Sequence, residues 1–314
     1  MPPGAASRRT LTQPAGIMNT HRCIAMLVAC LAPVGFARAE TVLLGVQEEL
    51  PGVHVGESSS NKVRALFSHG DAGWSAFPSD CPNAGCLKAA TRQYPHEVTW
   101  FVALDGRQVG KVVGRTPDEF RLHAHVGLQD IVGGQAPVVG KPSAEFGSFA
   151  ADKLHRPLVT VSRPYFKDPA VWKRAKVTPQ ILNQALTAFR SKVPRACKEG
   201  PSGDLVPFPY TQGDLEVRAH KSSRGALVMT VWLENARECD AADGEGLVTS
   251  RTFSVSEAGT WAFLGEGLLL VDAGDYDNDG QSELLFSLSG YNQGGYVLFS
   301  AADVELARFE FSYH

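Results

Sequence analysis

The chain has 314 residues, of which 44% are hydrophobic and 20% are charged, and its formal net charge is −3. This length and composition suffice for one large globular domain or two moderate ones. A weakly acidic protein has no electrostatic reason to bind nucleic acid or an anionic membrane surface, so we expect neither as a partner.

The N-terminal segment has the pattern of a secretory signal peptide. His21 and Arg22 precede an apolar run at residues 23–36, and the run ends at the small-x-small sequence of residues 37–39. The order of basic, apolar and small residues is typical of export signals, and the run is too short to span a bilayer as a helix. We therefore expect cleavage after Ala39 and an exported protein, periplasmic or extracellular, with no integral membrane segment in the mature chain.

Two features of this segment leave alternatives open. Met18 is a more natural start than Met1, because residues 1–17 place Pro and Gly ahead of the basic region. Leu27 to Cys30 resembles a lipobox, in which the cysteine is lipidated, but the apolar run continues past Cys30. Removing residues 1–39 takes away four arginines and no acidic residue, which lowers the formal net charge from −3 to −7.

The expected mature chain keeps Cys81, Cys86, Cys197 and Cys239. An even number of cysteines in an exported protein indicates disulfides, and three pairings are open. A turn-forming Pro-Asn-Ala-Gly insert separates the first two, so the simplest pairing joins Cys81 to Cys86 and Cys197 to Cys239. A zinc site is disfavoured because the spacing is not that of a zinc motif.

Strands are expected along most of the chain. Gly and Pro together make up 50 residues, which favours a β-rich protein with many turns. Val98–Leu104 and Gln108–Val113 flank Asp-Gly, a sequence typical of a β-hairpin. The other expected strands are Thr41–Val46, Val63–Phe67, Leu158–Ser162, Leu215–Ala219, Ala226–Glu234, Gly246–Val255, Glu283–Leu288, Tyr296–Phe299 and Val304–Phe311.

His123 and His125 form a His-x-His pair after the predicted hairpin. On a strand both rings would face the same side, as many metal sites require, whereas on a helix they would diverge. No carboxylate or further histidine is tied to them by spacing. An exposed strand face and a catalytic pair in a secreted hydrolase are both compatible with this pattern.

One amphipathic helix is expected near residues 179–192. Thr178 can cap it, Pro179 suits its first position, and apolar residues recur at helical spacing from Ile181 to Phe189. The Pro- and Gly-rich segment after this helix favours a domain boundary. We therefore predict a mainly β fold (β-rich α+β) of two β lobes, with domains at residues 40–195 and 196–314 after the signal segment 1–39.

The clearest chemical pattern lies between two C-terminal strands, at Gly274 to Phe286. Its acidic residues alternate along a short loop, and Gly280 stands where the backbone must turn sharply. The acidic positions are Asp275, Asp277, Asp279 and Glu283. Ca²⁺ takes six to eight oxygen ligands, and alternating carboxylates supply them. An EF-hand would need a Glu at Phe286, so the pattern predicts a nine-residue calcium loop between strands.

This loop resembles the FG-GAP or VCBS-type calcium loops of integrin-like β-propeller proteins. The resemblance covers about residues 270–299, and it implies that Asp275, Asp277, Asp279 and Glu283 bind Ca²⁺ through side chains and Gln281 through its carbonyl group. Propeller proteins carry several copies, whereas this chain has one. A single calcium-pinned hairpin within another β architecture is therefore favoured over a full propeller.

The familiar contiguous enzyme signatures are missing: the chain has no nucleophile elbow, zinc-protease helix, P-loop or dinucleotide fingerprint. We therefore expect an exported calcium-binding β protein whose calcium is structural, more readily a non-enzyme than an enzyme. The alternatives are a secreted hydrolase using His123 and His125, and a calcium-dependent adhesion or glycan-binding module of the cell envelope.

Overall fold

The computed structural model describes residues 41–50, 60–117, 120, 122–146, 153–233, 236–239, 249–290 and 292–313. The predicted signal peptide and Cys30 lie outside these residues, as do residues 246–248 of one predicted strand. In the described residues no helix is long and apolar enough to cross a membrane.

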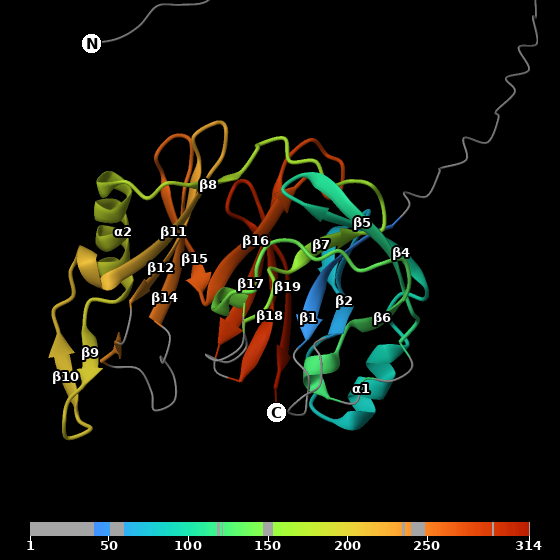
Figure 1. Cartoon of the computed structure of the whole chain (residues 1–314), viewed down its shortest axis with the longest axis horizontal. Helices are drawn as coiled ribbons and strands as arrows, with labels where there is room; N and C mark the ends of the chain where they lie inside the picture. Colours follow the sequence, from blue (N-terminus) through green and yellow to red (C-terminus); the bar gives the residue numbers. More distant parts are fainter. Residues whose placement is uncertain are drawn as a thin grey trace, which may run out of the picture. The chain divides into compact units, whose positions relative to one another are not determined.

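Six strands of the N-terminal half close into a barrel (Figure 1). Their order around it is β1-β7-β4-β5-β6-β2, and β2 pairs with β1 to complete the ring. Closure leaves none of these six strands at a free edge. The strands are β1 (Val42–Leu50), β2 (Ser60–Gly70), β4 (Val98–Leu104), β5 (Arg107–Gly114), β6 (Leu128–Gly133) and β7 (Leu158–Val161).

Short elements complete this half of the protein. Strand β3 (Gly73–Ala76) extends the sheet from β2, and helix α1 (Ala84–Thr91) begins between Cys81 and Cys86 and contains the second of them. Two single turns of 3-10 helix are η1 (His123–His125) and η2 (Ala144–Phe146). The β4–β5 hairpin is confirmed, and its Asp105-Gly106 turn has φ angles of +49° and +72°, the left-handed values that favour this dipeptide.

A five-stranded sheet and helix α2 form a second layer. The sheet order is β15-β14-β12-β11-β8, and α2 (Pro179–Lys192) packs against it through Ala185 and Phe189. Thr178 accepts a hydrogen bond from the Ile181 amide, as expected of the N-cap. The strands are β8 (Lys173–Ala175), β11 (Leu215–Lys221), β12 (Leu227–Leu233), β14 (Thr249–Val255) and β15 (Trp261–Glu266).

Beyond this sheet lies a small three-stranded one, β10-β9-β13. It consists of β9 (Ala196–Glu199), β10 (Leu205–Phe208) and β13 (Arg237–Glu238), and a turn of 3-10 helix, η3 (Gln212–Asp214), precedes β11. The predicted domain division at 195/196 stays a prediction. In the structure, β8 and α2 come before that point but pair and pack with strands that come after it.

The C-terminal sheet is a meander buried on both faces. Its strands are β16 (Leu268–Gly274), β17 (Glu283–Gly290), β18 (Gln293–Ser300) and β19 (Glu305–Ser312). Leu285 and Leu298 belong to the same hydrophobic core as buried residues of the barrel strands, whereas Leu284 and Phe286 pack in a separate core with Val228 of β12. The prediction of a mainly β fold with two β lobes and one clear amphipathic helix is confirmed.

Candidate metal centre

The acidic loop, residues 275–283, connects β16 to β17. These strands pair antiparallel with Gly274 opposite Glu283, so the first and last acidic residues of the loop are brought together by the sheet. Tyr276 anchors the loop because its ring is buried in the barrel core. Asn278 and Gly280 have φ angles of +66° and +89°, which turn the chain back toward β17.

Three of the predicted ligand side chains converge. Each of Asp275, Asp277 and Glu283 offers an oxygen atom, and these oxygens all lie within 4.8 Å of one another. Asp275 and Glu283 are eight positions apart in the sequence, and the turn of the loop brings their side chains together in space. This spacing fits one cation held by three carboxylates.

Backbone amides of the loop bond to the same carboxylates. The Gly280 amide donates to Asp275 Oδ2 at 3.0 Å, and the Tyr276 amide donates to Glu283 Oε2 at 2.7 Å. Asp279 lies outside the converging group, and its oxygens accept hydrogen bonds from the amide and side chain of Gln281 at 2.7 and 3.2 Å. The ligand roles of Asp279 and Gln281 stay predictions.

The loop concentrates negative charge in a partly buried place. Burial raises the pKa of Glu283 to about 8; the Tyr276 amide opposes this shift, and Asp277, Asp279 and Asp275 add to it. The pKa of Asp275 is also raised, first by burial. Oδ1 of Asp275 is buried and accepts no hydrogen bond from the described residues. A bound cation would favour the ionised carboxylates and give this oxygen a partner.

A histidine that sequence reasoning missed lies beside the loop. His69 is on β2, and its Nε2 is 3.3 Å from Asp277 Oδ2. Its ring packs against Trp74 of β3 with the ring centroids 4.9 Å apart. More than 200 residues separate His69 from Asp277, so no local spacing in the sequence indicates that they meet.

A turn at residues 166–172 supports the acidic loop from the other side. The Asp275 amide donates to the Lys167 carbonyl at 2.7 Å, and the Ser282 hydroxyl donates to Asp168 Oδ1 at 2.6 Å. A side chain at Gly274 would place its Cβ 3.0 Å from the Phe166 carbonyl oxygen and 2.6 Å from the Tyr276 ring. Glycine is therefore needed at position 274 for the loop to approach this turn.

The His-x-His pair lies elsewhere, in the 3-10 turn η1 beside β19. Burial lowers the pKa of His125, and Arg64 and Lys62 lower it further. Within the described residues neither His123 nor His125 has an ion pair with a carboxylate. The surroundings of His125 are therefore positively charged, and the hydrolase alternative stays a prediction.

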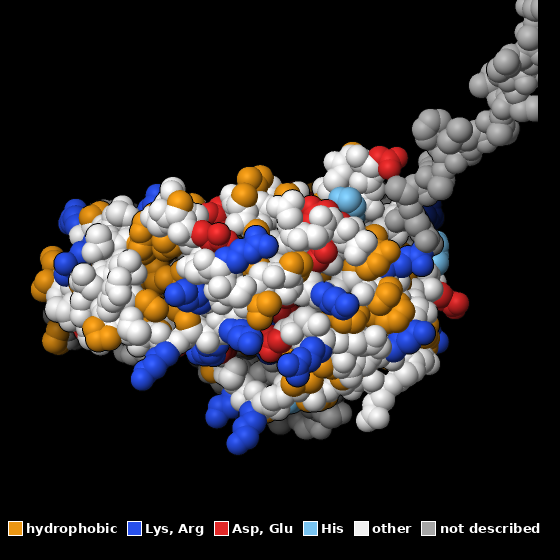
Figure 2. Space-filling view, turned by 90° about the horizontal axis from the view of Figure 1, so that it is seen from above, with side chains coloured by type: hydrophobic (Ala, Val, Ile, Leu, Met, Phe, Trp, Pro, Cys, Tyr) orange, Lys and Arg blue, Asp and Glu red, His pale blue; other side chains and the backbone are white. Residues whose placement is uncertain are grey.

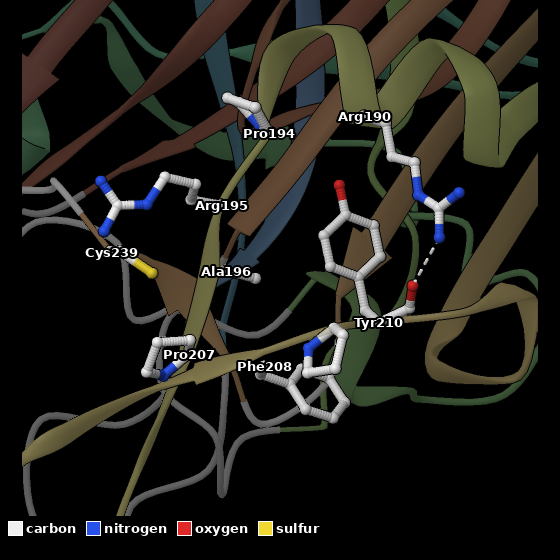
Figure 3. Close-up of a pocket in the computed structure, with 9 residues that line it drawn as sticks. Arg190, Pro194, Arg195, Ala196, Pro207, Phe208, Tyr210 and Cys239 are labelled. Atoms are coloured by element: carbon white, nitrogen blue, oxygen red, sulfur yellow. Dashed lines mark hydrogen bonds between the residues drawn. The ribbon is translucent and has the colours of Figure 1, made fainter.

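Both predicted disulfides are present, Cys81–Cys86 and Cys197–Cys239. Cys239 borders a cavity of about 450 Å³ at the end of α2 (Figure 3). Its walls are mostly proline and aromatic side chains, and the Arg190 guanidinium is engaged there, donating to the Tyr210 carbonyl at 2.8 Å. We find no constellation for catalysis in this cavity among the described residues.

No protein-family model, curated protein or solved structure matches this chain. The resemblance of the acidic loop to FG-GAP or VCBS-type loops therefore rests on its own residues.

Proposed function

We propose that the acidic loop binds a structural calcium ion and that the protein acts outside the cytoplasm. The observation that carries the metal proposal is the convergence of Asp275, Asp277 and Glu283 within 4.8 Å, with Oδ1 of Asp275 buried and lacking a hydrogen-bond donor in the described structure. The two disulfides and the N-terminal sequence pattern support export.

The donor chemistry favours calcium over other common metals. All three converging ligands are carboxylates, which suit a hard cation, whereas structural zinc sites use cysteine and histidine. Mg²⁺ demands a near-ideal octahedron and keeps several waters, while Ca²⁺ accepts irregular sets of carboxylate and carbonyl oxygens. A short acidic loop, with the Gln281 carbonyl as a further predicted ligand, matches the second description.

The ion would fasten the β16–β17 hairpin rather than perform chemistry. It would join Asp275 and Asp277, at the start of the loop, to Glu283, at its end. Extracellular modules bind calcium with Kd values of about 10⁻⁴–10⁻³ M, so millimolar calcium should add about 1 kcal/mol to the free energy of unfolding.

Calorimetric titration with CaCl₂ and thermal unfolding with and without a chelator test this proposal. We expect saturable binding, a higher Tm with calcium, and loss of both effects in Asp277→Asn. Asp204→Asn, an exposed position away from the loop, removes the same charge and should bind calcium like the wild type. The proposal is wrong if millimolar calcium produces no binding heat and no Tm shift, or if Asp277→Asn binds calcium as the wild type does.

A further inference from the structure

A cleft of about 1180 Å³ opens between the barrel and the two C-terminal β layers. Its walls come from the β4–β5 turn, residues 139–146, Arg156, the segment 167–174, and His220, which is on β11. Strand β16 lies at its floor. Ligand sites for small molecules typically enclose about 300–1000 Å³, so this cleft has room for a larger ligand.

Positive charge dominates this lining, and we call it the cationic cleft. Six basic side chains face four carboxylates in it. Five of the basic residues are exposed and have no ion pair among the described residues: Arg107, Lys141, Lys167, Lys173 and Arg174. Figure 2 shows Lys and Arg side chains gathering on one face of the molecule, with hydrophobic side chains between them.

The carboxylates of the cleft are already engaged. Asp105 and Asp272 lie 3.3 and 3.7 Å from the Arg156 guanidinium, and Glu145 pairs with Arg218. Asp168 accepts hydrogen bonds from the Ser282 hydroxyl and from the Ala170 and Trp172 amides. The five exposed cations are therefore left to attract an anion from solution.

His220 lies in the cleft wall, and its pKa is lowered there. Its pKa falls to about 4, chiefly through burial and then through Arg156 and Arg174. His220 is consequently neutral at physiological pH and does not add to the charge.

One apolar residue of the cleft, Val171, has a strained backbone conformation. Val171 has a φ angle of +52°, which a β-branched residue rarely adopts, and its side chain is 43% exposed in the cleft. Backbone strain of this kind is concentrated at ligand sites, where the surrounding structure maintains it. Trp172, Phe146 and Val109 add further apolar surface.

We propose that the cationic cleft binds an anionic glycan, with its carboxylate or sulfate groups on the exposed cations and its sugar rings against Trp172, Val171 and Phe146. Cations placed on separate segments suit a chain of repeated negative charges. Apolar side chains between them suit the C–H faces of sugar rings. This proposal is independent of the calcium proposal.

An acidic peptide fits this cleft less well. Peptides commonly add a strand to a free sheet edge, and β8 is the free edge of its sheet next to the cleft. Strand β8 has only three residues, and two of them are Lys173 and Arg174. A very short, charged edge strand is a poor template for strand addition.

Binding is measured by calorimetry at low salt with four probes: oligogalacturonate, sulfated dextran, uncharged dextran and polyglutamate. We expect binding of at least one anionic glycan, which identifies carboxylate or sulfate as the preferred group, and weaker binding at high salt through screening. Uncharged dextran should not bind. Binding of neither anionic glycan overturns the proposal, and polyglutamate binding as tightly as the glycans overturns the assignment to a glycan.

Paired charge variants locate the binding. Lys173→Gln with Arg174→Gln, and separately Arg107→Gln with Lys141→Gln, should each weaken glycan binding about tenfold. Lys88→Gln with Arg92→Gln removes two exposed charges at α1, away from the cleft, and should leave affinity unchanged. Circular dichroism confirms that each variant is folded. An equal loss of affinity in the α1 control and both cleft variants would show non-specific charge attraction and overturn the proposal.

Discussion

The acidic loop and the cationic cleft each contain a buried carboxylate with a raised pKa, but only the cleft supplies its own cation. Burial raises the pKa of Asp272, at the cleft floor, to about 7, and Arg156 opposes that shift. Burial raises the pKa of Glu283 to about 8, and neighbouring aspartates add to it. The difference is that Asp272 has an arginine beside it, whereas Glu283 has acidic neighbours, and the proposed calcium ion would balance their charge.

Removing the internal cation should have the largest effect. Arg156 donates from Nε to the Val271 carbonyl at 2.7 Å and lies beside Asp105 and Asp272. At about pH 9, where Asp272 is ionised, Arg156→Met would leave a buried carboxylate and a carbonyl without their partner, and we expect a loss of about 3–5 kcal/mol in the free energy of unfolding. Urea unfolding measures it.

Asp272→Asn added to Arg156→Met should recover part of this loss, because the unpaired charge is then removed. A double variant as unstable as the single one would show that Arg156 acts through packing or its bond to Val271 alone. The charge balance assigned to the cleft would then be wrong.

A smaller effect is expected from pH. Because the pKa of Asp272 is about 7 in the folded protein and near 3.8 in the unfolded chain, the folded state binds this proton more tightly. The resulting stability is fully present below about pH 4 and is lost as the pH rises through 7, and we expect a change of about 3 kcal/mol. Urea unfolding across this range measures it.

Asp272→Asn isolates the contribution of this one group. The variant lacks the titrating carboxyl, so its stability relative to the wild type should increase from pH 4 to pH 8. Glu283 titrates in both proteins and cancels from the difference when both are measured with a chelator. If the difference in stability between Asp272→Asn and the wild type does not vary with pH, the pH dependence comes from another group.

The two regions also differ in how much of them could be predicted from the sequence. The convergence of Asp275, Asp277 and Glu283 could be predicted because these residues lie on one short loop and follow a spacing typical of calcium loops. His69 and the turn at 166–172 reach the loop through tertiary packing. The cleft could not be predicted, because Arg107, Lys141 and the segment 167–174 become neighbours only in the fold.

The elements of the fold differ in the same way. The β4–β5 hairpin and helix α2 carry local signals, an Asp-Gly turn and a capped apolar face, and both are confirmed. Strand β16 carries none, because all seven of its residues are buried and an apolar run has no alternation. Strand β8 has three residues, too few for any period to show.

The smallest effect we expect would connect the two regions. The turn at 166–172 contacts the acidic loop through Ser282 and Asp168, and Lys167 and Asp168 of this turn also line the cationic cleft. Calcium that orders the loop should therefore order one wall of the cleft. We expect calcium to raise glycan affinity about fivefold, and bound glycan to raise calcium affinity by the same factor, because coupling between two binding equilibria is reciprocal.

Ser282→Ala tests this connection without altering a predicted side-chain ligand of the metal. The hydroxyl of Ser282 donates to Asp168 Oδ1 at 2.6 Å and accepts from the Ala170 amide at 3.2 Å, so its loss removes both of these bonds between the loop and the turn, while the bond from the Asp275 amide to the Lys167 carbonyl remains. Calcium and glycan should each still bind, but their coupling should fall toward one. Ser287→Ala, whose hydroxyl bonds to the Leu269 carbonyl on the neighbouring strand, should keep the wild-type factor. If both variants keep it, the Ser282 hydroxyl does not transmit the effect; a wild-type factor of one would instead show that the acidic loop and the cationic cleft are energetically separate sites.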